Sequence, residues 1–403
     1  MKNIILAAYI LFLPFQMMIP GAQILNNLNL FLIVLGFIFI SQRQEKFENP
    51  KFHKPLLLFL LVWTFSFIYT LFTSNEFLMV EAMREFKRLI TLVIGYFVIV
   101  RCLEKKENIW FLFYVFLLSV VLVGLHTWRN GVLAGPNFSD FKRSSGPFGQ
   151  GFEGSDIAGG FLATFMPFLF SFFIFTKNKI FMAGAGIGFI IALCGLLTTY
   201  SRGSFIALGI GIIAIGLVAL PYLLKHSKFT ATMVIVFFII IGLSWQVWMP
   251  QSIVNRFEKT VVRSDYPGEE TLDSSSQGRV ELWQEGIDLF WENPLFGQGF
   301  KKPQLIIGKD THNSFILIGT EMGILGLLFF FLFLGNVLKE AIVVANSEFA
   351  AIGFGFVGCI FSFLVVNMFY SNFFRDTVVG SFWIILGILA FSRKFVITTV
   401  ANK

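Results

Sequence analysis

Two arginines in this sequence have the type and position for chemistry on an anionic substrate. Arg202 stands at the predicted start of a helix in TTYSRGSF, where a cation opposes the helix dipole. Arg279 has no carboxylate four residues later, because that position is Trp283. An arginine with a helix N-terminus is a good phosphate site, so we expect an anionic ligand at Arg202. Arg279 lies toward an apolar face next to a glycine that leaves room, so it also calls for an anionic partner. The alternatives are an Arg202 side chain that reaches the lipid headgroups and a cation–π contact between Arg279 and Trp283.

His312 is the candidate for proton transfer. It opens the apolar run HNSFILIGTEMGILGLL, and a neutral imidazole at an interface can act as a general base near neutral pH. Taken alone, a histidine at a helix start is more often structural, so its candidacy depends on the surrounding residues. Glu321 lies about nine rises of 1.5 Å further on and on the opposite face, which assigns it a packing or pairing role.

A second group of cations lies in VEAMREFKRLI. Arg84 and Arg88 fall on one face of a helix, where like charges repel, and Lys87 lies beside them. They either bind an anion or pair with Glu81 and Glu85 within one turn. Three more residues are candidates for substrate binding: Ser201 beside Arg202, Asn313 beside His312, and Trp283 four residues after Arg279.

The polar stretch 277–294 predicts an amphipathic helix. One face of a helical wheel carries Val280, Trp283, Ile287, Phe290 and Trp291. The opposite face carries the acids Glu281, Glu285, Asp288 and Glu292. We expect Ser275 or Ser276 to cap this helix and Pro294 to end it. It should lie on the bundle or at the membrane surface, with Arg279 at the edge of the apolar face beside Gly286.

Composition predicts an all-α polytopic membrane protein. The chain of 403 residues is 56% hydrophobic and 14% charged, which is too apolar for a soluble protein. The net charge of +7 comes from basic residues in short loops, so we expect a lipid bilayer and no nucleic acid as partner. The sequence predicts a single membrane domain over 1–403 with about twelve spans. These are 3–20, 24–41, 55–73, 86–103, 108–128, 157–176, 179–199, 203–224, 229–249, 312–337, 349–370 and 378–396.

The alternation of basic loops predicts the orientation. Every second loop carries lysine or arginine, which places both termini in the cytoplasm. Two long loops, 129–156 and 250–311, then lie outside, and the second is a large loop between the ninth and tenth spans. Within it, Val261 to Ser276 should be a flexible polar segment.

The order of short motifs resembles the O-antigen ligase and polymerase superfamily. The motifs are SRG after a span, GR-x-x-x-W, NPLFGQGF and HNS-x-x-x-x-x-x-E-x-G-x-x-G, from about Thr198 to Gly326, with GPFG at 146–149 upstream. That family often has Asn before the small residues of the upstream loop, whereas this chain has Ser155-Asp156. No role is therefore assigned to Asp156.

The resemblance implies a lipid-dependent glycosyltransferase fold in the bacterial inner membrane, with a large periplasmic loop. Its donor would be a glycan on undecaprenyl diphosphate at the periplasmic face. Arg202 and Arg279 would hold the diphosphate, helped by Arg84 or Arg88, while His312 would accept or orient the proton of the attacking hydroxyl. No Asp, Glu and His cluster has metal-ligand spacing, and arginines can neutralise a diphosphate, so we expect no metal and no other cofactor.

The sequence leaves the acceptor open. The first hypothesis is an O-antigen ligase acting on lipid A–core, and the second is an O-antigen or exopolysaccharide polymerase. A protein O-oligosaccharyltransferase is a third possibility. A polysaccharide transporter would carry charges and broken helices near the membrane midplane. Here the charges cluster at the predicted outer interface, which favours an enzyme.

Overall fold

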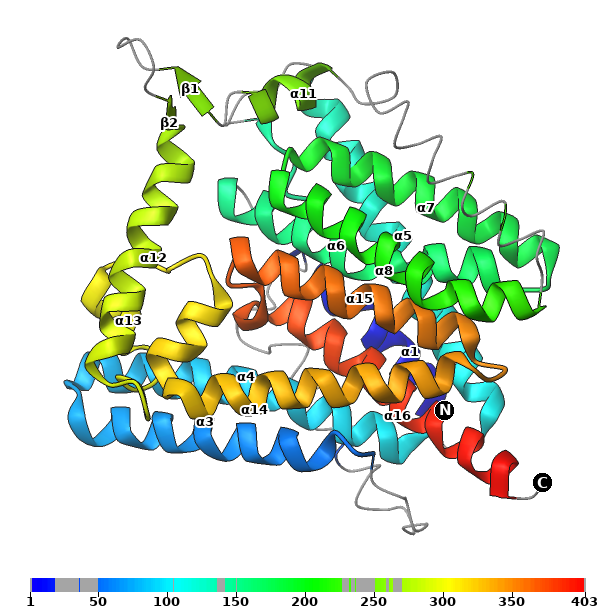
Figure 1. Cartoon of the computed structure of the whole chain (residues 1–403), viewed down its shortest axis with the longest axis horizontal. Helices are drawn as coiled ribbons and strands as arrows, with labels where there is room; N and C mark the ends of the chain where they lie inside the picture. The colour runs from blue at the N-terminus through cyan, green and yellow to red at the C-terminus, as the bar shows by residue number, and fades with distance from the viewer. Residues whose placement is uncertain are drawn as a thin grey trace. The chain divides into compact units, whose positions relative to one another are not determined.

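The computed structural model describes residues 2–18, 36, 50–103, 105–135, 142–149, 151–226, 232, 236, 251–258, 261–263 and 270–401 (Figure 1). This part of the chain is almost entirely helical, which confirms the predicted all-α class. Its first helices are α1 (Lys2–Phe12), the 3-10 helix η1 (Leu13–Met18), α3 (His53–Thr73), α4 (Glu76–Cys102), α5 (Lys106–Ala134), α6 (Gly151–Phe175), α7 (Lys179–Thr199) and α8 (Arg202–His226). Its later helices are α11 (Gln251–Glu258), α12 (Ser274–Glu292), α13 (Lys302–Ile307), α14 (Ser314–Ala345), α15 (Ala350–Phe369), the 3-10 helix η3 (Asn372–Phe374) and α16 (Asp376–Ala401).

A small hairpin interrupts the helices. Strands β1 (Val261–Arg263) and β2 (Glu270–Leu272) pair antiparallel, with Val261 opposite Leu272. The flexible segment predicted from Val261 to Ser276 therefore contains both strands and, at its end, the first turn of α12.

Eight helices of the described residues are long and apolar enough to cross a membrane. They are His53–Thr73, Lys106–Ala134, Glu153–Phe175, Lys179–Thr199, Arg202–Lys225, Ser314–Ala345, Ala350–Phe369 and Asp376–Val396. The first predicted span, 3–20, corresponds to a shorter apolar helix, Asn3–Phe15. The fourth, 86–103, lies in α4, whose apolar stretch is flanked by Arg88 and Arg101, and α4 is not among the eight. The predicted spans 24–41 and 229–249 lie outside the described residues, apart from Gly36, Thr232 and Val236.

The chain forms two compact units. Unit 1 comprises Met1–Ser119, Arg279–Val344 and Asn367–Lys403, and unit 2 comprises Val120–Gly278 and Ala345–Val366. The division falls inside α5, α12 and α15 and before the last residue of α14, and it also divides the predicted loop 250–311.

Unit 1 is held together by helix pairs with aromatic contacts. Helix α4 packs along α16, where a Cβ on Gly387 would come within 2.9 Å of the Ile99 side chain. Helices α3 and α14 lie side by side, and the rings of Phe59 and Phe330 are 5.5 Å apart (Figure 1). Trp63 of α3 is 2% exposed and contacts several further rings. The Phe59–Phe330 contact joins α3 to α14 within this unit.

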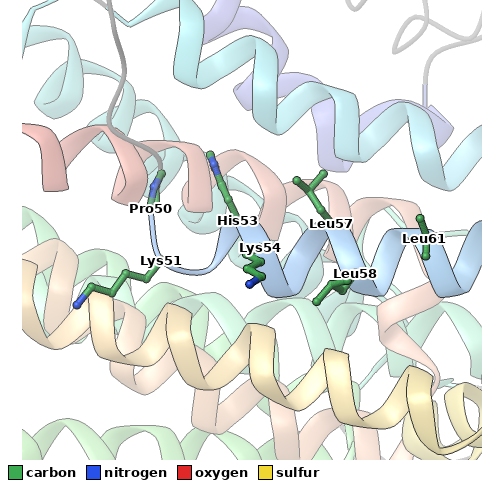
Figure 2. Close-up of a pocket in the computed structure, with 7 residues that line it drawn as sticks. All are labelled: Pro50, Lys51, His53, Lys54, Leu57, Leu58 and Leu61. Carbon is green, nitrogen blue, oxygen red and sulfur yellow. The ribbon is translucent and has the colours of Figure 1, made fainter.

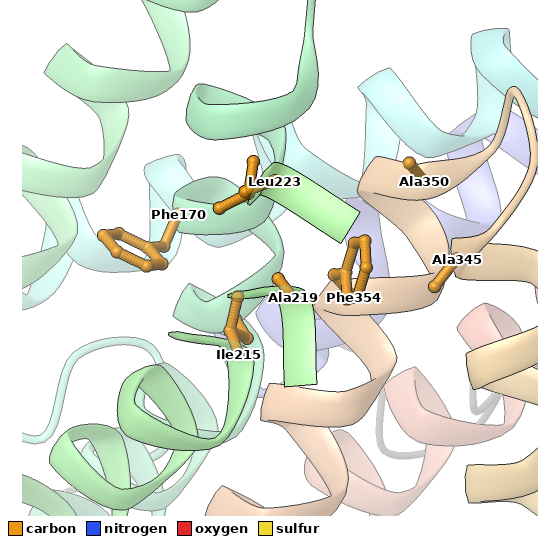
Figure 3. Packing of buried hydrophobic residues seen from close by; sticks show 7 residues of the cluster. All are labelled: Phe170, Ile215, Ala219, Leu223, Ala345, Ala350 and Phe354. Carbon is orange, nitrogen blue, oxygen red and sulfur yellow. The ribbon is translucent and has the colours of Figure 1, made fainter. Parts of the chain in front are cut away.

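Unit 2 depends on small residues that let helices approach closely. A Cβ on Gly195 of α7 would lie 2.4 Å from the Gly124 carbonyl oxygen of α5, so glycine is needed there. A Cβ on Gly159 of α6 would lie 2.7 Å from the Ser204 hydroxyl of α8. An apolar cluster completes the unit (Figure 3), with members Phe170, Ile215, Ala219, Leu223, Ala345, Ala350 and Phe354.

Candidate functional site

Arg279 lies near the start of α12, and its guanidinium is placed over an aromatic ring. The Arg279 Cζ atom is 5.0 Å from the centre of the Tyr370 ring, which comes from the connection between α15 and α16. The alternative considered from the sequence was a cation–π contact with Trp283, one turn further along α12. The indole N–H of Trp283 is buried and has no hydrogen-bond partner in the part of the chain that the structure describes.

The faces of α12 are divided differently from the helical wheel. The acidic residues Glu281, Glu285, Asp288 and Glu292 are exposed, as the wheel predicts. On the apolar side Leu289 is 8% exposed, whereas Ile287 and Trp291 are 45% and 68% exposed. Gly286 is buried, and a Cβ there would lie 2.5 Å from the Ile316 side chain. The gap that glycine leaves is therefore filled by the start of α14, so α12 lies against that start.

His312 lies in a tight turn immediately before α14. Its φ of 52° is left-handed, a conformation in which histidine is enriched relative to other non-glycine residues. Asp310 accepts a hydrogen bond from the His312 backbone N–H at 2.9 Å, as in an Asx turn. Helix α14 begins at Ser314, two residues after the predicted boundary. His312 itself is half-buried, and the backbone is held by hydrogen bonds on both sides of it.

Asn313 is the N-cap of α14. Its side-chain oxygen accepts hydrogen bonds from the N–H groups of Phe315 at 2.9 Å and Ile316 at 3.2 Å. This satisfies donors that a helix N-terminus leaves free. In this structure the side chain of Asn313 therefore positions the residue before it, and its predicted contact with substrate stays a prediction.

The connection between α15 and α16 joins the Arg279 and His312 segments. Tyr370 contacts Arg279, and its carbonyl oxygen is 3.3 Å from the Ser314 hydroxyl. The next residue, Ser371, donates a hydrogen bond to the Asp310 carboxylate that also holds the His312 turn. Tyr370 therefore contacts Arg279, and Ser371 holds the turn of His312 through Asp310. The sequence did not single out either Tyr370 or Ser371.

The NPLFGQGF motif forms a loop, residues 293–300, that fits into a break in α14. At Gly323 the backbone leaves the helical region, with φ 66° and ψ −165°. The Thr320 carbonyl then accepts the Gln298 N–H at 2.7 Å, and the Pro294 carbonyl accepts the Ile324 N–H at 2.8 Å. The loop thus uses backbone groups that an unbroken helix would have paired internally.

Two glycines make this fit possible. A Cβ on Gly297 would lie 2.5 Å from the Met322 nitrogen, and a Cβ on Gly323 would lie 2.2 Å from the Leu295 carbonyl oxygen. Both glycines also have positive φ values, which other residues adopt at a cost. The E-x-G pattern of α14 and the NPLFGQGF motif therefore belong to one structural feature, the loop 293–300 packed into the break of α14.

In unit 2, Arg202 pairs with a carboxylate. Its Nη1 atom lies 2.8 Å from Asp273 Oδ2, and its Nη2 atom lies 3.3 Å from the Ser276 hydroxyl. Burial raises the pKa of Asp273, but the hydrogen bonds from Arg202 and Ser276 outweigh it, and the net pKa is lowered. Ser201 is buried, and its hydroxyl is 2.7 Å from the Ser204 hydroxyl. Arg202 thus has a protein anion as partner here.

The GPFG loop of unit 2 is fixed to neighbouring helix ends. Arg143 forms an ion pair with Asp156 and donates to the Thr199 carbonyl at 2.8 Å. The Ser144 N–H donates to the Thr198 carbonyl at 3.0 Å. Asp156, to which the sequence assigned no role, is therefore the ionic partner of this loop.

The cations of α4 are divided between surface and ion pairs. Arg84 and Lys87 are exposed. Arg88 pairs with Glu85 on its own helix and with Asp376, whose Oδ1 lies 2.8 Å from Arg88 Nε. The local pairing considered from the sequence is present for Arg88, and a second carboxylate joins it.

A cavity of about 490 Å³ lies at the N-terminal end of α3 (Figure 2). Its lining residues are Pro50, Lys51, His53, Lys54, Leu57, Leu58 and Leu61. The NPLFGQGF loop contacts α3 at Ser66, about 18 Å along the helix from Lys54. This cavity is therefore separate from the Arg279 and His312 segments.

Comparison with known families bears on this arrangement. Residues 187–331 match the family model of the O-antigen ligases. The predicted resemblance to this superfamily is confirmed over these residues, which include the SRG, GR-x-x-x-W, NPLFGQGF and HNS motifs. Comparison with curated proteins finds no match. The O-antigen ligase match and the apolar helices together support a membrane protein of the glycan ligase or polymerase type.

Proposed function

We propose that this chain is a glycosyltransferase that moves a glycan from undecaprenyl diphosphate to an acceptor hydroxyl, as in ligation of O-antigen to lipid A–core. The observation that carries the proposal is the shared support of Arg279 and His312 in unit 1. A cation suited to diphosphate and an imidazole suited to proton transfer are both held by Tyr370 and Ser371. The reaction needs one group of each kind.

In the proposed reaction His312 accepts the proton of the acceptor hydroxyl as its oxygen attacks the anomeric carbon. The bond from that carbon to the diphosphate breaks, and the guanidinium of Arg279 stabilises the charge that develops on the leaving diphosphate. The indole N–H of Trp283, one turn from Arg279 and without a hydrogen-bond partner among the described residues, would be a second donor for this anion. Arg202 keeps its proposed role as a diphosphate ligand on the basis of the sequence.

The donor's lipid tail would lie against apolar surface beside the NPLFGQGF loop. A groove of about 700 Å³ in unit 1 is lined largely by side chains of α3, together with Phe296 of the loop and Leu325 of α14. A lipid-linked donor suits such a surface, because its apolar tail can make van der Waals contact with the apolar side chains there. The predicted orientation places this reaction in the periplasm and both termini in the cytoplasm.

A deletion strain tests the proposal and separates the ligase from the polymerase. If the chain is the ligase, deletion removes all polymer from lipid A while lipid-linked chains of normal length accumulate. Products with a single repeat on lipid A would instead identify a polymerase. Unchanged lipopolysaccharide together with unchanged lipid-linked glycans would contradict both.

A further inference from the structure

Glu321 lies in the apolar helix α14, and its carboxyl group is buried. It is 0% exposed, and one oxygen, Oε1, accepts hydrogen bonds from the Lys301 backbone N–H at 3.1 Å and from Gln304 Nε2 at 2.9 Å. Among the described residues no cation lies within ion-pair distance of it. The charges that act on it more weakly are Lys301, which attracts, and Asp310, which repels. An isolated carboxylate in such a place is strongly disfavoured.

A second observation concerns the other carboxyl oxygen of Glu321, Oε2, and the amide oxygen of Gln304. Glu321 Oε2 is buried and has no hydrogen-bond partner among the described residues, and the same is true of Gln304 Oε1. The carboxyl and the amide already share one hydrogen bond, from Gln304 Nε2 to Glu321 Oε1. Two buried acceptors therefore remain unsatisfied in one side-chain pair, and a single proton on Oε2 would satisfy both of them.

We propose that Glu321 carries this proton and forms a cyclic acid–amide pair with Gln304, and that the pair is the positioning element of the Arg279 and His312 site. Glu321 Oε2–H donates to Gln304 Oε1, while Gln304 Nε2–H donates to Glu321 Oε1. The carboxyl acts as a neutral hydrogen-bonding group and not as a charge. Glu321 is thus a positioning residue without contact to substrate, an inference that rests on the function proposed above.

The position of Glu321 explains how it acts at a distance. Its side chain joins α13 to α14, and its backbone carbonyl accepts hydrogen bonds from the Ser66 hydroxyl at 2.6 Å and the Gly299 N–H at 3.2 Å. One residue therefore connects α3, the NPLFGQGF loop, α13 and α14 at the break. The loop continues from α12, which carries Arg279, and α14 follows directly from His312. Loss of the pair would displace both.

The proposal predicts an order among variants of the full-length protein in nanodiscs. Glu321→Gln keeps every bond, because its amide can donate to Gln304 Oε1, so the melting temperature stays unchanged and transfer stays near the native rate. Glu321→Ala lowers the melting temperature and lowers transfer about a hundredfold through misplacement. Gln304→Glu alone places two carboxyl groups side by side, so it also lowers the melting temperature and the transfer rate. The double variant Glu321→Gln with Gln304→Glu restores an acid–amide pair, so it restores both the melting temperature and the transfer rate.

Infrared difference spectroscopy of native protein against Glu321→Gln reads the protonation state of the Glu321 carboxyl directly. The native protein should show the carbonyl stretch of a protonated carboxyl at pH 7, and the variant should lack it. A carboxylate band in its place, or a Glu321→Gln variant as damaged as Glu321→Ala, would overturn the proposal. Melting and infrared measurements need no substrate, so they decide whether the acid–amide pair exists even if the chain transfers no glycan.

Discussion

Nη1 of Arg202 lies 2.8 Å from Oδ2 of Asp273, and the same carboxylate holds the start of α12. The second oxygen of Asp273 accepts the Ser276 N–H at 2.7 Å, as an N-cap does. The sequence had suggested Ser275 or Ser276 for this cap. One carboxylate thus fixes both an arginine of α8 and the first turn of α12, within unit 2.

This double role predicts a pH dependence. Because the pKa of Asp273 is lowered in the folded chain, its stabilisation is present above the unfolded pKa of about 3.9. It is lost as pH falls through the lowered folded pKa. Asp273→Asn, which can still cap the helix, should cost about 2 kcal/mol at pH 7 by removing the charged bond to Arg202.

Melting temperature followed from pH 7 to pH 3 in detergent checks this prediction. The difference between native protein and Asp273→Asn should shrink below about pH 4. Asp273→Ala should be less stable than Asp273→Asn by about 1 kcal/mol, since it also loses the cap. Identical pH profiles for native protein and Asp273→Asn would refute the ion pair's contribution.

Substitution of His312 should abolish transfer without disturbing the fold. His312→Asn is the appropriate variant, because asparagine tolerates the left-handed backbone at φ 52° better than alanine does. We expect loss of measurable transfer with normal membrane levels and an unchanged melting temperature. Normal transfer by this variant would remove His312 from the mechanism.

Replacement of Arg279 tests whether a planar guanidinium is required. Arg279→Lys keeps the charge but loses the bidentate geometry for phosphate and the stacking on Tyr370, so it should be nearly as harmful as Arg279→Ala. Tyr370→Phe keeps the ring and serves as the matched control, with transfer close to the native rate. Full activity of Arg279→Lys would mean that charge alone suffices.

Local patterns in the sequence predicted the helices well, because apolar length and proline positions are local signals. Pro294 follows the end of α12 closely, as expected, and the acids of α12 face outward. The exposure of Ile287 and Trp291 could not be read from a wheel, since it depends on where neighbouring elements stop covering the helix.

The sequence could not show which residues contact the candidate site residues. Tyr370 reaches Arg279 from a distant part of the chain, and no spacing rule connects them. Gly323 stands in an apolar run that reads as one continuous helix. Its break depends on the NPLFGQGF loop, which supplies replacement hydrogen bonds. Only tertiary structure could show this.

The break in α14 predicts a large difference between two glycine substitutions in that helix. Gly323→Ala forces a Cβ to within 2.2 Å of the Leu295 carbonyl in a conformation suited to glycine, so it should cost at least about 2 kcal/mol. Gly335→Ala has open space and helical backbone, so it should be neutral or stabilise by up to about 1 kcal/mol. Comparable melting temperatures for the two variants would show that the break is not essential.

Metal removal tests how the diphosphate is neutralised. If arginines carry this role, transfer should continue in EDTA at the native rate. Transfer that stops in EDTA and returns with added magnesium would show that a divalent ion shares the role.

The most direct measurement is glycan transfer by the purified chain in proteoliposomes, supplied with a labelled glycan on undecaprenyl diphosphate and with lipid A–core. The account predicts label on lipid A–core and release of undecaprenyl diphosphate, both absent with His312→Asn. Donor that remains intact beside lipid A–core, or label that appears equally with His312→Asn, would contradict it.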